Sequence, residues 1–130
     1  MPVSGLGPYD DQNIFARLLR GEIPSRRVYE DEWAVAFHDI APQAKLHVLV
    51  VPRGRYVSLA DFTRDASDAE VAGFFRAVGV VARQLGLEEP GYRILANMGA
   101  DGGQEVPHFH VHLFGGEALS QRMVNPREPG

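Results

Sequence analysis

Three histidines, His108, His110 and His112, recur at every second position near the end of the chain, with large apolar residues between them. Side chains alternate between the two faces of a β-strand, so a strand here would place the three imidazoles in one row, about 6–7 Å between neighbours. An imidazole changes charge near neutral pH and can act as a nucleophile, a general acid, a general base or a metal ligand. The row is therefore the candidate chemical centre of the protein.

The segment that leads into this row, residues 99–106, is rich in glycine. Glycines let a backbone turn sharply and approach a ligand closely, and successive N–H groups can cradle an anion. A plain connection between two strands can have the same composition. The position of the segment beside the histidines favours a phosphate-binding loop.

Two further polar residues lie in or beside apolar segments. His47 interrupts the apolar run 46–51, where a lone histidine is usually a core residue with its hydrogen bonds satisfied. Asp39 follows the expected strand 33–37, where an aspartate commonly caps a turn. The residues alone leave a structural and a functional interpretation open for both.

Five short segments extend the pattern beyond the histidine row. Together with the row they fall in the order seen in the Hint branch of the histidine triad (HIT) family of nucleotide hydrolases and transferases, and the chain resembles the bacterial members of that branch. The resemblance covers about residues 12–116. The segments are residues 13–15, 20–24, 37–40, 42–44 and 102–106.

The resemblance implies a role for each histidine of the site. His110 would attack phosphorus and form a nucleotidyl-histidine intermediate that water then hydrolyses. His108 and His112 would hydrogen-bond the phosphoryl oxygens, and His112 is the candidate for protonating the departing amine. His47 would orient His108 by a hydrogen bond.

The resemblance also implies a nucleotide pocket. Asp39 would accept hydrogen bonds from both ribose hydroxyls, since one carboxylate can accept two donors. Glu105 replaces the serine of animal Hint proteins, and a carboxylate there would repel a phosphate. The expected contacts with the nucleotide are Asn97, Gly103, Gln104, Glu105, Val106, Asp39, His38 and Leu49, and the residues expected to line the base pocket are Ile14, Phe15, Leu18, Phe37 and Ile40.

Hydrophobic periodicity and turn residues predict an α+β fold. We expect an antiparallel five-stranded sheet with two helices over one face. The helices are expected at residues 13–20 and 67–86, and the strands at residues 27–29, 33–37, 46–51, 92–97 and 107–114. The expected domain organisation is a flexible leader at 1–12, the HIT domain at 13–116 and a C-terminal tail at 117–130.

Composition limits the class of protein and its partners. A chain of 130 residues forms one domain, and without cysteine it has neither disulfides nor a thiolate zinc site. A net charge of −4 argues against broad nucleic-acid binding. No segment reaches the roughly 18 apolar residues of a membrane span. We expect a cytoplasmic protein with no cofactor, no metal, no membrane and no nucleic acid as partner.

The helix expected at 67–86 carries more apolar side chains than one sheet face of a small domain can bury. In Hint-like proteins this helix and the strand that follows it, here residues 92–97, form a two-fold interface that joins the sheets of two subunits. The resemblance therefore implies a homodimer.

The expected activity is hydrolysis of the P–N bond of a purine nucleoside 5′-phosphoramidate, which gives the nucleoside monophosphate and an amine. One alternative is cleavage of dinucleoside polyphosphates, as in the Fhit-like branch, although Gly115 and Gly116 after the histidine row favour the Hint side. A second is a metal-binding protein, because histidines spaced in this way also bind Zn²⁺ or Fe²⁺. A third is a non-catalytic nucleotide-binding protein, for which the intact row gives no support.

Overall fold

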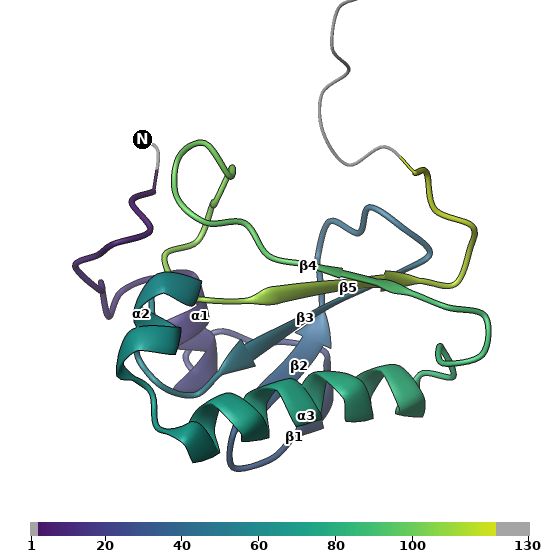
Figure 1. The fold of residues 1–130 in the computed structure, drawn as a ribbon, viewed down its shortest axis with the longest axis horizontal. Coiled ribbons are helices and arrows are strands. Elements are labelled where there is room, and N and C mark those ends of the chain that lie inside the picture. Colours follow the sequence, from purple (N-terminus) through teal and green to yellow (C-terminus); the bar gives the residue numbers. More distant parts are fainter. Residues whose placement is uncertain (1–2, 122–130) are drawn as a thin grey trace, which may run out of the picture.

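A computed structural model describes residues 3–121 of the chain (Figure 1). Its five strands form one antiparallel sheet in the order β1-β2-β3-β5-β4, which confirms the predicted sheet. None of the helices in this part of the chain is long and apolar enough to cross a membrane. The elements are α1 (Ile14–Leu19), β1 (Arg27–Glu30), β2 (Ala34–His38), β3 (Leu46–Pro52), α2 (Leu59–Asp65), α3 (Asp68–Gln84), β4 (Arg93–Leu95) and β5 (Val111–Gly115).

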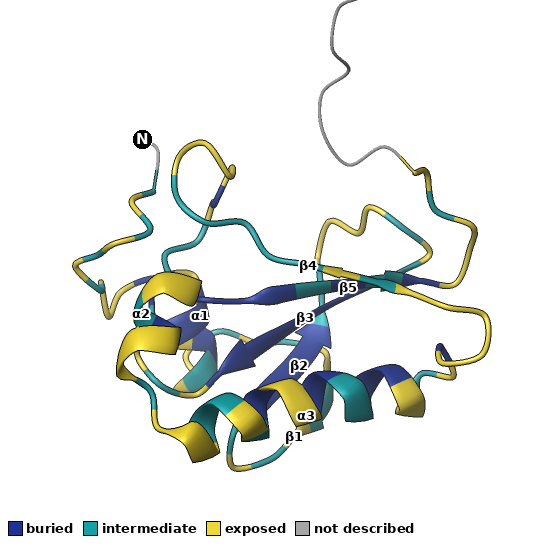
Figure 2. Cartoon of the chain, viewed as in Figure 1, coloured by how far each residue is buried: buried dark blue, intermediate teal, exposed yellow. Residues whose placement is uncertain are grey.

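Both faces of the central strands β2 and β3 are covered (Figure 2). Val48 and Val50 belong to a large cluster with α2 and α3, while Leu49 and Val51 belong to a smaller cluster with α1. The expectation that all helices lie over one face is therefore wrong. A continuous apolar strand must be buried on both sides, so the run 46–51 already required a second layer.

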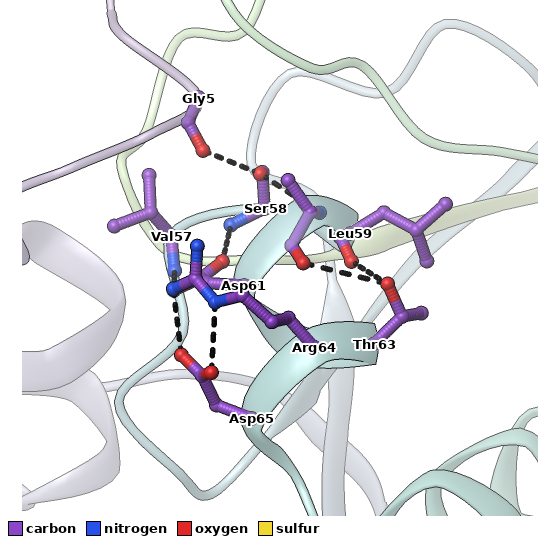
Figure 3. Close-up of polar contacts among 9 residues, drawn as sticks. Gly5, Val57, Ser58, Leu59, Asp61, Thr63, Arg64 and Asp65 are labelled. Atoms are coloured by element: carbon purple, nitrogen blue, oxygen red, sulfur yellow. Dashed lines mark hydrogen bonds and ion pairs between the residues drawn. The ribbon is translucent and has the colours of Figure 1, made fainter.

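The helix α2 was not predicted from the sequence, although its local signal is present. Ser58 and Asp61 form a capping box at its start, and the buried Phe62 anchors it to the core. Figure 3 shows the polar contacts around this turn. The longer helix α3 agrees with the prediction at its start, where Ser67 and Glu70 form a second capping box.

The histidine row is not one continuous strand. β5 begins at Val111, so only His112 of the three lies within it, and the predicted strand 107–114 starts too early. The ladder with β3 ends at the pair Val50–Val111. Pro52, at the end of β3, has no N–H to donate to a neighbouring strand. The chain before Val111 therefore lies outside the sheet.

The described part of the segment before α1 makes specific contacts with the rest of the domain. The Ser58 hydroxyl donates to the Gly5 carbonyl at 2.6 Å (Figure 3). The Arg55 guanidinium donates to both carboxylate oxygens of Asp11, at 2.8 and 2.9 Å. In the described residues, this segment is therefore part of the domain that carries the histidines.

Candidate active site

The strand register brings His112 and His47 to the sheet face that α1 covers. His112 pairs across the ladder with Leu49, and Leu49 pairs with Phe37. Cross-strand partners share a face, and both apolar residues belong to the cluster beneath α1. His47 lies two residues before Leu49 on the same face, and its ring centroid is 5.2 Å from that of His112.

The hydrogen bond of His110 defines the chemical form of its imidazole. Its Nδ1 lies 2.6 Å from the backbone carbonyl oxygen of His108. A carbonyl can only accept, so Nδ1 carries the hydrogen and Nε2 of the neutral ring keeps its lone pair. The ring is 6% exposed and packs edge-on against Phe15 at 5.0 Å between centroids. His110 is therefore held as a neutral imidazole with Nε2 free to act as a nucleophile.

Hydrogen bonds also fix which ring nitrogens of His47 and His112 carry the hydrogen. The Gln43 N–H donates to Nδ1 of His47 at 3.1 Å, so the hydrogen of the neutral His47 ring lies on Nε2. That Nε2 is 2.9 Å from Nδ1 of His112, which accepts. His112 consequently carries its own hydrogen on Nε2, available as a donor. The expectation that His47 orients His108 is wrong, because its hydrogen bond goes to His112.

His108 is enclosed by the protein. Its side chain is fully buried, and its Nε2 donates to the Pro52 carbonyl oxygen at 2.8 Å. The Tyr9 hydroxyl lies 2.6 Å from its Nδ1 and donates to it. Both ring nitrogens are thus engaged, and the expected hydrogen bond from His108 to a phosphoryl oxygen does not agree with this structure. Tyr9 is not among the site residues predicted from the sequence, and no recognised motif gives a signal for it.

Burial keeps all four histidines neutral near pH 7. It lowers the pKa of His108 and that of His112 to about 4, and in both cases the charge of His110 adds to the effect. Burial also lowers the pKa of His110 and that of His47, against the opposing influence of the Asp39 carboxylate. A neutral central imidazole is the form that can attack an electrophile.

Asp39 lies beside this group of histidines. Its Oδ1 accepts from the Ala41 N–H at 2.8 Å in a local turn, and its Oδ2 is 3.4 Å from Nε2 of His47. Asp39, His47 and His112 together present three possible metal-binding atoms within 4.8 Å of one another. This donor set does not fit a metal, because the Gln43 N–H occupies Nδ1 of His47 and leaves its Nε2 protonated.

Four of the apolar residues expected around the nucleotide lie on the same face as His47 and His112. Phe15, Leu18, Phe37 and Leu49 are buried in the cluster beneath α1. Ile14 and Ile40 are more open, with exposed fractions of 45% and 97%. His38 differs, because it pairs with Val48, whose side chain belongs to the cluster on the opposite face. The structure does not bring the His38 side chain to the other histidines.

The side chain of Gln104 holds the glycine-rich loop in place through three hydrogen bonds. Its Oε1 accepts from the Gly99 N–H at 2.9 Å, and its Nε2 donates to the carbonyls of Val57 and Val106 at 2.7 and 3.0 Å. This side chain therefore shapes the loop, and the expected contact of Gln104 with a nucleotide stays a prediction. Gly103, at φ +76°, adopts a conformation that favours glycine.

Three other expected contacts lie along the same loop and the short connection between β4 and that loop. Val106 packs against the apolar cluster beneath α1. Asn97 is partly buried, and Glu105 is exposed. The Glu105 carboxylate acts electrostatically on His110 and opposes the fall in the pKa of that imidazole. A negative side chain thus lies within electrostatic range of the candidate nucleophile.

We predict that the folded protein loses stability as the pH falls from 6.5 towards 4. In the unfolded chain a histidine has its ordinary pKa of about 6.5 and takes up a proton in this window, whereas His108 and His112 stay neutral when folded. Each such histidine favours unfolding by up to about 1.4 kcal/mol per pH unit. Denaturant unfolding at several pH values measures this slope, and NMR titration of the histidine C2 protons identifies the groups. Triad imidazoles that titrate near 6.5 would contradict the prediction.

The sequence is similar to those of several known proteins. The family model described as the HIT domain matches residues 20–119. An uncharacterised HIT-like protein of Azospirillum brasilense is 60% identical over 85% of this chain and 91% of its own length. The purine nucleoside phosphoramidase of Escherichia coli K12 is 36% identical over 88% of this chain and 96% of its own length.

Solved structures show the same similarity in three dimensions. A histidine triad protein from Clostridium difficile has a TM-score of 0.78 and 40% identity, and the match covers 85% of this chain and 95% of that one. A HIT family hydrolase from Clostridium thermocellum has a TM-score of 0.77 and 31% identity, over 88% and 99% of the two chains. With its buried histidine row and a family match over most of its length, the chain belongs to the HIT family.

Proposed function

We propose that the protein hydrolyses the P–N bond of purine nucleoside 5′-phosphoramidates to a nucleoside monophosphate and an amine. The observation that carries this proposal is the tautomer of His110, whose Nδ1–H is bonded to the His108 carbonyl so that Nε2 keeps its lone pair. The E. coli relative, named a purine nucleoside phosphoramidase, supports the choice of substrate class. Homologues named HIT family hydrolases support the reaction class.

The first chemical step is displacement at phosphorus. Nε2 of His110 forms a bond to phosphorus while the P–N bond to the amine breaks. The amine leaves with the electron pair and takes up a proton from water, while Nε2–H of His112, on the ring atom that is not bonded to His47, donates a hydrogen bond to the departing group. The positive charge that develops on the His110 ring is stabilised by the carbonyl dipole at its Nδ1–H.

The second step releases the nucleotide. Water attacks phosphorus, the bond from phosphorus to Nε2 of His110 breaks, and the attacking water loses one proton to the solvent, which replaces the proton given to the amine. Two displacements at phosphorus thus replace a single attack by water, which would have to expel the amine, a poor leaving group. In the second displacement the leaving group is the His110 imidazole, which departs as a neutral ring. Neither step needs a metal, since backbone N–H groups of the glycine-rich loop and Nε2–H of His112 would stabilise the negative charge of the phosphoryl oxygens by hydrogen bonds.

The nucleoside would lie on the face that α1 covers. Phe15, Phe37 and Leu49 supply apolar surface there, and the exposed Ile14 and Ile40 would close around the base. Asp39 would accept the ribose hydroxyls on Oδ2, because its Oδ1 is already bonded to the Ala41 N–H. Asn97, Gly103, Glu105 and Val106 would border the phosphate, with Gln104 holding the loop in shape.

We also propose a homodimer built on the exposed apolar patch formed by Leu59, Phe75, Tyr92 and Ile94. These side chains are 38–46% exposed, and three of them border an apolar hollow of about 190 Å³. β4 is an edge strand within the described residues, since it pairs only with β5. A second copy related by a two-fold axis would cover the patch and continue the sheet through β4.

Replacing His110 with alanine should abolish turnover and leave nucleotide binding largely intact. The imidazole supplies the bond to phosphorus rather than most of the contacts, so kcat should fall by at least about 10³-fold. Steady-state kinetics with a fluorogenic adenosine phosphoramidate measure the loss of turnover, and calorimetry with the nucleoside monophosphate measures binding. His110→Gly with added imidazole should recover part of the rate. Near-normal turnover by His110→Ala would exclude the mechanism.

Replacing Asp39 with asparagine should raise KM for ribonucleoside substrates. A lost charged hydrogen bond to the ribose costs about 1–3 kcal/mol, and a 2′-deoxy substrate should show a loss of the same order with the unmodified protein. Asp68→Asn, on the exposed first turn of α3, removes the same charge and is the matched control. If ribo and deoxy substrates behave alike, Asp39 serves only its local turn.

Sedimentation at micromolar concentration should give twice the 14.3 kDa mass of the chain. Ile94→Glu places a charge on the free edge of β4 and should give a monomer. Leu6→Glu introduces the same charge at another exposed apolar residue and should leave the mass unchanged. A mass near 14.3 kDa for the unmodified protein would contradict the dimer.

A further inference from the structure

Tyr9 connects the N-terminal segment directly to the histidine row. Its hydroxyl is 2.6 Å from Nδ1 of His108, and the two rings meet edge-to-face with centroids 5.7 Å apart. Nε2 of the same imidazole faces the Pro52 carbonyl, which can only accept. The neutral ring therefore carries its hydrogen on Nε2, and the tyrosine O–H is the donor to Nδ1.

The segment around Tyr9 is held at both ends. The Arg55 guanidinium lies 5.2 Å from the centroid of the Tyr9 ring and also donates two hydrogen bonds to Asp11. The Gly5 carbonyl accepts from the Ser58 hydroxyl at the start of α2 (Figure 3). A tyrosine fixed in this way keeps its hydroxyl at His108 at a low entropy cost, because its neighbours already restrict the ring.

We infer that Tyr9 is a positioning residue of the active site, which holds His108 so that the His108 carbonyl keeps the nucleophile His110 in its reactive orientation. The contact runs from the Tyr9 hydroxyl to the His108 ring, and from the His108 backbone to Nδ1 of His110. The inference rests on the proposed function for its kinetic consequence, although the hydrogen bonds stand without it. Tyr9 touches no reacting atom in this account.

Removal of the hydroxyl has a defined physical consequence. Nδ1 of His108 is buried, so it would lose its donor with no water to replace it. If the ring changed tautomer instead, its unprotonated Nε2 would face the lone pairs of the Pro52 carbonyl. Either change displaces the His108 ring or backbone and with it the acceptor of His110. Small misplacements of a reacting group reduce the rate of chemistry more than they reduce binding.

The test is Tyr9→Phe in the full chain, with Tyr29→Phe as the matched control. Tyr29 also donates its hydroxyl from a partly buried position, to Asp31 at 2.8 Å, but it lies on β1 away from the histidines. With the fluorogenic adenosine phosphoramidate, Tyr9→Phe should lower kcat about tenfold, the effect of one buried unpaired acceptor. KM should stay within about twofold, and both constants of Tyr29→Phe should do the same.

Nitrogen-15 NMR of the imidazoles supplies a readout that does not need turnover. The Nδ1 resonances of His108 and His110 should move in Tyr9→Phe and stay in place in Tyr29→Phe. A kcat within about twofold of the unmodified protein together with unmoved resonances would overturn the inference. So would equal losses of kcat in both variants. If the unmodified protein does not cleave the phosphoramidate, the proposed function fails, and the resonances alone decide the role of Tyr9.

Discussion

The hydrogen bond from Nδ1 of His110 to the His108 carbonyl, 2.6 Å long, places the hydrogen of the central imidazole on the side facing the backbone. The opposite nitrogen is then the only one with a lone pair to offer. Because a backbone carbonyl accepts and never donates, this assignment does not depend on the protonation of any other side chain. The remaining features of the site either hold this bond in place or depend on its result.

Burial and hydrogen bonding act together on the surrounding histidines. Burial disfavours the charged imidazolium, so the row stays neutral at a pH where free histidines begin to protonate. Hydrogen bonds then select the tautomers, with the Gln43 N–H setting His47 and His47 setting His112. The site thereby carries an acceptor at Nε2 of His110 and a donor at Nε2 of His112. That pairing suits a displacement in which one nitrogen bonds to phosphorus and the other donates a hydrogen bond to the reacting group.

The sequence predicted the parts that depend on local pattern. The apolar run 46–51 and the capping box at Ser67 predicted the third strand and the long helix, whereas the alternation of histidines predicted a strand that starts too early. Hydrogen-bond partners depend on which backbone atoms the fold brings near each ring, and sequence spacing does not contain that information. The sequence therefore misassigned the partner of His47 and the role of the His108 ring, and it gave no signal for Tyr9, which lies 99 positions from its partner.

The stereochemical course at phosphorus tests the central claim most directly. The substrate is an adenosine 5′-phosphoramidothioate of one configuration, hydrolysed in heavy-oxygen water by the unmodified protein. Each in-line displacement inverts phosphorus, so attack by His110 followed by attack by water predicts overall retention of configuration. Inversion would show that water attacks the substrate in a single step, and would contradict the role assigned here to Nε2 of His110.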